Sequence, residues 1–183
     1  MSRRNDVSSN HYSNALLSEG SADGSSGPVA LERFERSPKL AELKVAYRSR
    51  TKVQERRTLR NSTDAADYLR AIWNANTLEL VEEFVMICLN GSGEAIGWVK
   101  VSSGGMNATQ VDSRLVFAIA LQTACTAIVV AHNHPGGKTD PSPQDKEITQ
   151  RLKEAGRLLG IAVLDHIIIS RDSAFSFAEN GLL

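Results

Sequence analysis

Residues 127–145 read AIVVAHNHPGGKTDPSPQD, and this stretch decides the fold that the sequence predicts. Its first five residues are apolar and rich in β-branched side chains, which is typical of a buried strand. Residues two apart in a strand point to the same side, so His132 and His134 are predicted to aim both imidazoles at one point. The glycines and prolines that follow predict a compact loop rather than a continued strand.

The chain is then predicted to turn back into a helix. Ser142 followed by Pro143 is typical of an N-cap and a first helical residue, and Asp145 falls in the first turn. Two imidazoles and one carboxylate should therefore face each other across the loop. Three protein ligands of this type, with a fourth position left for water, are typical of a catalytic zinc site, whereas structural zinc sites usually have four ligands and favour thiolates. The same ligand set also suits iron or manganese.

The spacing of this motif resembles a known family. His-x-His, seven residues, Ser, two residues and Asp is similar to the metal motif of the JAB/MPN (JAMM) metalloproteases. The longer string His-Asn-His-Pro, with Pro-Ser before the final Asp, more narrowly resembles the RadC family of bacterial proteins. The resemblance runs from about residue 40 to residue 183 and implies a JAB/MPN (cytidine deaminase-like) fold. It also implies a zinc metallohydrolase of metallopeptidase type, with one Zn²⁺ held by His132, His134 and Asp145.

The resemblance also implies which residues perform catalysis. Hydrolysis at zinc needs a group that takes a proton from water and passes one to the leaving group. In the family this group is a Glu at the start of a core strand, and Glu82-Glu83-Phe84 matches the RadC-like pattern Glu-x-Phe with Glu82 in the catalytic place. Strand alternation lets only one of the two acids face the site, so Glu83 is the alternative and should otherwise face away, solvated or paired. Ser142 would cap its helix and also stabilise an oxyanion.

Composition predicts one domain preceded by a tail. The chain has 183 residues, of which 42% are apolar and 23% are charged. Residues 1–38 are rich in Ser, Asn and Gly and are expected to be a disordered N-terminal tail, and residues 39–183 are expected to form the hydrolase domain. No helix-hairpin-helix region of the kind found in longer RadC-like proteins is visible, so a short form is expected. Cys88 and Cys125 have no Cys-x-x-Cys spacing and should be buried free thiols.

The charge and the apolar stretches predict a soluble, cytoplasmic protein that does not enter a membrane. The formal net charge is zero, so nothing global steers the chain to nucleic acid or to an acidic membrane. The first twenty residues lack the apolar segment of a secretory signal. Residues 115–131 are interrupted by polar side chains and are shorter than the ~20 residues that a membrane span requires, so a buried helix followed by a buried strand is the better interpretation.

Periodicity predicts a mixed α/β fold. The expected elements are an edge strand within 40–59, a helix capped by Ser62 and ending near 74, strands at 78–89 and 94–101 joined by a turn, a helix from 112 or 113 to about 125, a strand ending at His132, a helix over 143–159 with Ile148, Leu152, Ala155 and Leu159 on its buried stripe, a strand over 161–170 and a short C-terminal piece. Hairpins beside helical crossovers favour a three-layer α-β-α arrangement with a mixed central sheet.

Three functions are compatible with this pattern. The leading hypothesis is a JAMM-type zinc hydrolase acting on an amide or isopeptide bond in a protein or peptide. The alternative is a nucleic-acid-associated accessory protein in DNA repair or mobile-element biology, which would use the basic segment 44–60 and retain the metal for stability. The third is a folded pseudoenzyme. His166 is expected to be a hydrogen-bonded core or edge histidine rather than a metal ligand, and a contact with one of the ligands stays open.

Overall fold

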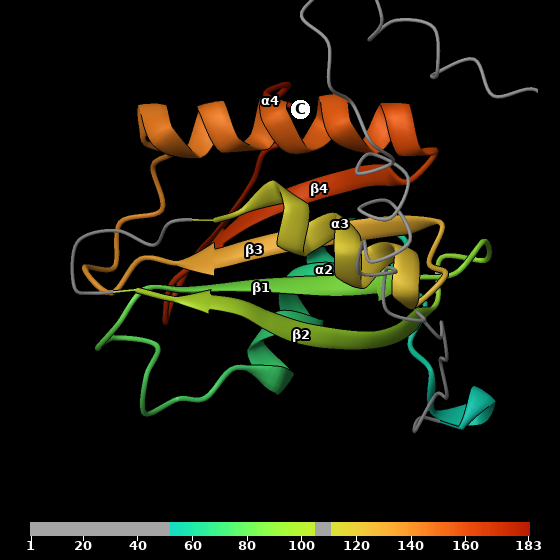
Figure 1. The fold of residues 1–183 in the computed structure, drawn as a ribbon. Coiled ribbons are helices and arrows are strands. Elements are labelled where there is room, and N and C mark those ends of the chain that lie inside the picture. The colour runs from blue at the N-terminus through green and yellow to red at the C-terminus, as the bar shows by residue number, and fades with distance from the viewer. Residues whose placement is uncertain (1–51, 105–110) are drawn as a thin grey trace, which may run out of the picture. The chain divides into compact units, whose positions relative to one another are not determined.

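The computed structural model describes residues 52–104 and 111–183. The elements in these ranges are η1 (Val53–Glu55), α2 (Ser62–Ile72), β1 (Glu83–Leu89), β2 (Ala95–Ser103), α3 (Ser113–Gln122), β3 (Ala127–Asn133), α4 (Pro143–Leu159), β4 (Ala162–Ile169) and β5 (Ala174–Ser176) (Figure 1). The predicted tail and residues 40–51 of the predicted edge strand lie outside the described residues. The described end of that segment forms η1 and one isolated bridge between Thr58 and Glu94.

Five strands form a single mixed sheet in the order β2-β1-β3-β4-β5. Strand β1 pairs antiparallel with β2 and with β3, and β4 pairs antiparallel with β5. Strands β3 and β4 are parallel and are joined by α4, which forms the crossover that parallel neighbours require. The mixed sheet predicted from the sequence is therefore confirmed, and the strand that carries His132 is its central strand.

The sheet is covered on both faces, which confirms the predicted three layers. Alternate residues of β1 point to opposite faces, so Val85 and Ile87 pack with Leu69 of α2, whereas Met86 packs with Val116 of α3. Leu152 of α4 belongs to the same cluster as Met86. Figure 1 shows α2 behind the sheet and α3 in front of it. The two clusters are separated by the sheet, and the face shared by α3 and α4 is the one on which the site lies.

Two element boundaries differ from the sequence prediction. Helix α2 is capped by Asn61, whose side chain accepts the backbone N–H of Asp64 at 2.8 Å, and Ser62 is the first helical residue rather than the cap. Asn and Ser are comparably good caps, so the sequence does not distinguish Asn61 from Ser62 as the N-cap. Strand β1 begins at Glu83 and not at 78, because the preceding residues turn back on themselves through backbone bonds such as Leu80 N–H to Thr77 O (3.0 Å).

Helix α4 has the predicted bounds but not the whole predicted buried stripe. Leu159 is 45% exposed, and the fully buried positions are Thr149, Leu152 and Gly156. A Cβ added to Gly156 would lie 2.4 Å from the carbonyl oxygen of Ile161, so the absence of a side chain allows α4 to lie directly on the start of β4. The side of α4 that carries Gly156 therefore faces the sheet, and the leucines at the end of the helix lie at the surface.

The apolar stretch 115–131 divides into α3 and β3, as predicted. Asp112 caps α3 through the backbone N–H of Arg114, and the helix ends at Gln122. Among the described residues, no helix is long and apolar enough to cross a membrane. Cys125, which follows α3, and Cys88 in β1 are both buried and free, as expected.

Candidate metal centre

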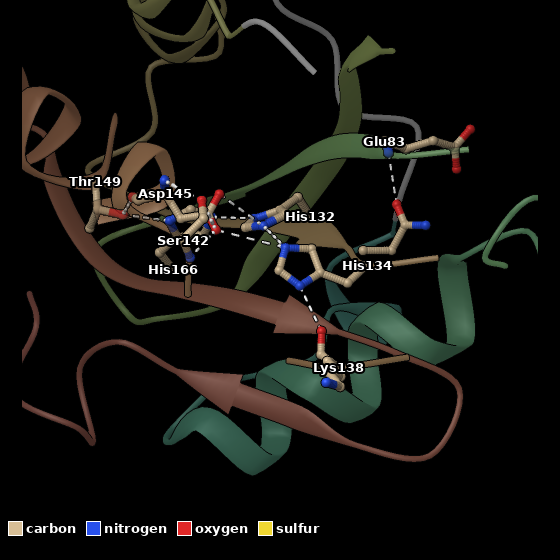
Figure 2. A network of polar contacts seen from close by, with 9 residues as sticks. Glu83, His132, His134, Lys138, Ser142, Asp145, Thr149 and His166 are labelled. Carbon is tan, nitrogen blue, oxygen red and sulfur yellow. Dashed lines mark hydrogen bonds and ion pairs between the residues drawn. The ribbon is translucent and has the colours of Figure 1, made fainter. Parts of the chain in front are cut away.

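The two histidines at the end of β3 and the carboxylate at the start of α4 converge, as their spacing predicts. One ligand atom from each of His132, His134 and Asp145 lies within 4.8 Å of the others. His132 Nε2 is 3.0 Å from His134 Nε2 and 3.2 Å from Asp145 Oδ1, and His134 Nε2 is 3.7 Å from Asp145 Oδ2. Figure 2 shows the three side chains pointing at one another from the strand and from the helix. Two nitrogens and one carboxylate at this separation match the ligand set of a divalent cation site.

His134 is held by the loop that follows it. Its Nδ1 lies 2.7 Å from the carbonyl oxygen of Lys138. A carbonyl oxygen only accepts, so Nδ1–H is the donor, and in the neutral ring Nε2 is the nitrogen whose lone pair faces His132 and Asp145. The loop returns to this position through a tight turn in which the Gly137 N–H donates to the His134 carbonyl (3.0 Å) and Gly137 adopts a φ of 83°. Glycine adopts that left-handed conformation without the steric cost that other residues incur.

Asp145 is oriented by Ser142. The Ser142 backbone N–H and its hydroxyl both lie 2.7 Å from Asp145 Oδ2 and donate to it, while the Asp145 N–H donates to Ser142 Oγ at 3.2 Å. This reciprocal capping box confirms the predicted N-cap. Burial alone would raise the pKa of the Asp145 carboxyl, but His132 and Ser142 together hold that pKa well below its ordinary value. The carboxylate is therefore charged and aimed at the histidines.

His166 and Thr149 form a buried hydrogen-bonded pair next to His132. His166 is wholly buried in β4, and its Nε2 lies 2.8 Å from His132 Nδ1. Its Nδ1 lies 2.6 Å from Thr149 Oγ1, which is also wholly buried. Burial lowers the pKa of His166 well below its ordinary value, with a smaller contribution from His132, so the ring is neutral. His166 is therefore the hydrogen-bonded core histidine that the sequence predicts, and its contact with His132 is the one that the sequence left open. Thr149 was not singled out at all, although it lies one helical turn after Asp145.

Glu82 and Glu83 lie on opposite sides, as strand alternation requires. Glu82 lines the cleft that contains His132 and His134, together with Phe84 two residues later. Glu83 is buried and points away from the histidines (Figure 2), and its carboxylate pairs with Lys100 and accepts from Thr77 Oγ1 at 3.0 Å. Glu83 is therefore paired rather than solvated.

Asn133, between the two histidines, holds the segment that carries Glu82. Its side chain is fully buried and donates to the carbonyl oxygens of Leu78 (2.6 Å) and Val81 (2.8 Å). Its Oδ1 accepts the backbone N–H of Glu83 at 2.7 Å. Three hydrogen bonds from one amide therefore fix the turn before β1 to the strand that carries the histidines, on the face opposite to the imidazoles.

The converging ligands and Glu82 line a cleft that is open to solvent. Its walls come from the start of α3, the loop after β3 and the first turns of α4, and its lining residues include Ser113, Arg114, Lys138, Ser142, Ile148 and Arg151. Three of these are basic, and the acids Asp112 and Glu147 lie beside them. The predicted ligands, Glu82 and Ser142 therefore share one solvent-accessible cavity.

Comparison with known proteins agrees with this geometry. The family described as RadC-like JAB domain matches residues 59–182. The "UPF0758 protein" of Trichlorobacter lovleyi is 42% identical over 150 residues, which cover 79% of this chain and 64% of the relative. That of Flavobacterium johnsoniae is 42% identical over 55% of this chain and 44% of the relative, and that of Porphyromonas gingivalis is 46% identical over 56% and 45%. The chain thus spans less than two thirds of the length of these relatives. With its matched residues covering the whole sheet and the converging ligands, the chain belongs to the RadC family and carries its JAB domain.

Proposed function

We propose that this protein is a metal-dependent hydrolase of JAMM type that binds one zinc ion and cleaves amide or isopeptide bonds. The observation that carries the proposal is the convergence of two imidazoles and one charged carboxylate within 4.8 Å, at the floor of a cleft that also contains Glu82. His134 Nε2 lies 3.0 Å from His132 Nε2. Such an arrangement is favourable when a cation or a shared proton lies between the groups.

The residues of the cleft divide the chemistry between them. A divalent cation held by His132, His134 and Asp145 would supply Lewis-acid activation of water and of the carbonyl under attack. Glu82 would accept the proton of the attacking water as the carbon–oxygen bond forms, and would deliver it to the leaving nitrogen as the carbon–nitrogen bond breaks. Both tasks need a carboxylate on the cavity side of β1, and Glu82 rather than Glu83 lies there.

Ser142 would stabilise the negative charge that develops on the carbonyl oxygen. Its hydroxyl lines the cleft and donates to Asp145 Oδ2 in the structure, so this role requires the hydroxyl hydrogen to turn from Asp145 towards the substrate. The oxygen would continue to accept the Asp145 N–H during that rotation, because a hydroxyl accepts and donates at once.

The test combines metal analysis with cleavage of a fluorogenic peptide library and of a library joined through lysine side chains. Wild type is expected to bind one zinc equivalent and to cleave members of at least one library. Glu82→Gln should still bind one equivalent while its cleavage rate falls by about 100-fold or more, the usual effect of losing a general acid/base. Equal cleavage by the two proteins would remove Glu82 from this role, and a wild type that binds no zinc would overturn the proposal.

The nucleic-acid alternative draws less support from the described part of the basic segment. Three of its cations are paired with carboxylates: Lys52 with Glu55 (3.9 Å), Arg56 with Glu94 (3.9 Å) and Arg60 with Asp64 (3.3 Å). Cations paired within the protein have fewer donors left for phosphates. A DNA titration at several salt concentrations separates the two functions, since tight binding that weakens steeply with salt would favour the alternative.

A further inference from the structure

A chain of buried hydrogen bonds runs from α4 through β4 to the metal ligand on β3. The His166 ring connects Thr149 to His132. Its Nδ1 lies 2.6 Å from Thr149 Oγ1, and its Nε2 lies 2.8 Å from His132 Nδ1. Thr149 Oγ1 also contacts the backbone carbonyl oxygen of Asp145, one turn earlier in the same helix. Both side chains behind the ligand are wholly buried, so water does not compete for these contacts.

The direction of every hydrogen bond in this chain follows from the contact between Thr149 and the Asp145 carbonyl. The Asp145 carbonyl oxygen has no hydrogen to give, so in its contact with Thr149 the hydroxyl is the donor. The Thr149 oxygen then accepts the hydrogen of His166 Nδ1. The His166 ring is wholly buried between a hydroxyl and a second imidazole, where a positive charge would be costly, so it carries only one ring hydrogen and its Nε2 accepts from His132 Nδ1–H. His132 Nε2 is then the nitrogen that faces Asp145 and His134, and once it carries no hydrogen its lone pair is directed at them.

The opposite direction would disable the ligand. If the Thr149 hydroxyl donated to His166 Nδ1, the ring hydrogen of His166 would move to Nε2 and be donated to His132 Nδ1. The hydrogen of His132 would then lie on Nε2, which faces the other two ligands. A protonated imidazole nitrogen has no lone pair for a metal ion.

We infer that Thr149 is a positioning residue that acts through His166 to hold His132 in the tautomer able to bind metal. The inference rests on the proposed metal site and goes beyond it, because neither Thr149 nor His166 belongs to the converging ligand set. Groups that orient a metal-binding histidine in this way typically change metal affinity by about 10–100-fold.

Replacement of Thr149 by Val tests this relay, since Val keeps the shape and removes the hydroxyl. Zinc affinity, measured by competition with a chromogenic chelator, should fall by about tenfold. Thr149→Ser keeps the hydroxyl and should restore affinity close to that of wild type. Thr123→Val is the matched control, because Thr123 also donates to a carbonyl one turn earlier, that of Ile119 (3.0 Å), at the distant end of α3. It should lose stability without losing zinc affinity.

Histidine ring nitrogen NMR supplies a readout that a loss of stability alone would not move. Metal-free wild type should show His166 with its hydrogen on Nδ1, and Thr149→Val should show a mixture of tautomers at His166 and at His132. Unchanged tautomers and unchanged zinc affinity in Thr149→Val would overturn the inference. Failure of the proposed function would look different: wild type would take up no zinc, while the tautomer shift in the metal-free variant would still decide the role of Thr149.

Discussion

At the scale of single residues, strand alternation at the start of β1 turns the adjacent side chains of Glu82 and Glu83 to opposite sides. Glu82 opens into the cleft, whereas Glu83 is only 2% exposed and pairs with Lys100 and Thr77 on the other side. A buried carboxylate is tolerated only when its partners replace water. The structural acid and the proposed catalytic acid are therefore separable by substitution.

Glu83→Gln should lower the free energy of unfolding by about 1–3 kcal/mol, because the amide loses the ion pair with Lys100 and has only one oxygen where the two partners contact two. Denaturant unfolding measures this loss. Glu79→Gln is the control, since Glu79 pairs with Arg171 at 3.5 Å with both side chains largely exposed, and its loss should be under about 0.5 kcal/mol. Equal losses at the two positions would contradict a structural role for Glu83.

At the scale of elements, the site depends on how β3 is tied to the turn before β1 and on how closely α4 packs on β4. Asn133 makes the first connection through three hydrogen bonds on the face opposite to the imidazoles. Gly156 makes the second possible, because its missing side chain leaves room for the chain at Ile161. Each connection leads to a separate expectation about stability.

Asn133→Asp should destabilise the fold by roughly 2–4 kcal/mol, because the carboxylate keeps the shape but cannot donate to the carbonyls of Leu78 and Val81. Asn180→Asp is a matched control, since Asn180 donates to the Ser176 carbonyl (2.8 Å) from an exposed position. The control should lose less than about 1 kcal/mol because water replaces the lost bond. A thermal or denaturant melt compares the two, and similar losses would argue against the buried clamp.

Gly156→Ala should also destabilise, by about 1–3 kcal/mol, although alanine favours helices over glycine by up to ~1 kcal/mol. The added methyl group would meet the Ile161 carbonyl at 2.4 Å and Val163 Cγ2 at 3.2 Å, so α4 would have to move away from β4. Gly91→Ala is the comparison, since nothing lies within 4 Å of its added Cβ. If Gly156→Ala proved as stable as wild type, the close approach of α4 would not matter for stability.

At the scale of the whole molecule, the proposed cation would link the central strand to the crossover helix. Its ligands come from the end of β3 and the start of α4, two elements that follow one another in the chain. A ligand that binds only the folded state stabilises it by about 2.7 kcal/mol at a free concentration 100 times its Kd. Metal binding should therefore be visible as a gain in the stability of the domain.

Removal of zinc with a strong chelator should lower the Tm of wild type by several degrees, in keeping with the size of the domain. Asp145→Asn should have a Tm that does not respond to the chelator, because one ligand is lost while the amide oxygen can still accept the Ser142 N–H. Differential scanning calorimetry with parallel metal analysis makes the comparison. A wild type that holds one zinc ion but melts at the same temperature without it would contradict the link between metal and fold.

The sequence by itself determined the features that depend on nearby residues. The His-x-His pair, the loop and the Ser142–Asp145 cap lie within fourteen residues, so strand alternation and helix capping were enough to predict their convergence. The bounds of α4 and the alternation of Glu82 and Glu83 followed in the same way. The three layers were predicted because the hydrophobic pattern of each element agreed with the family resemblance.

Only the tertiary structure decided what lies behind the candidate metal ligands. Strands β3 and β4 pair Ile128 with Val163 but Val129 with Asp165, so Leu164 is an extra residue that changes the alternation of β4. Val163 and His166 therefore both face α4, three residues apart, which a regular strand would not allow. The contact of His166 with Thr149 then depends on the packing of α4 over β4. Such a register shift and such a packing distance arise from contacts between distant segments, and no local pattern in the sequence carries them.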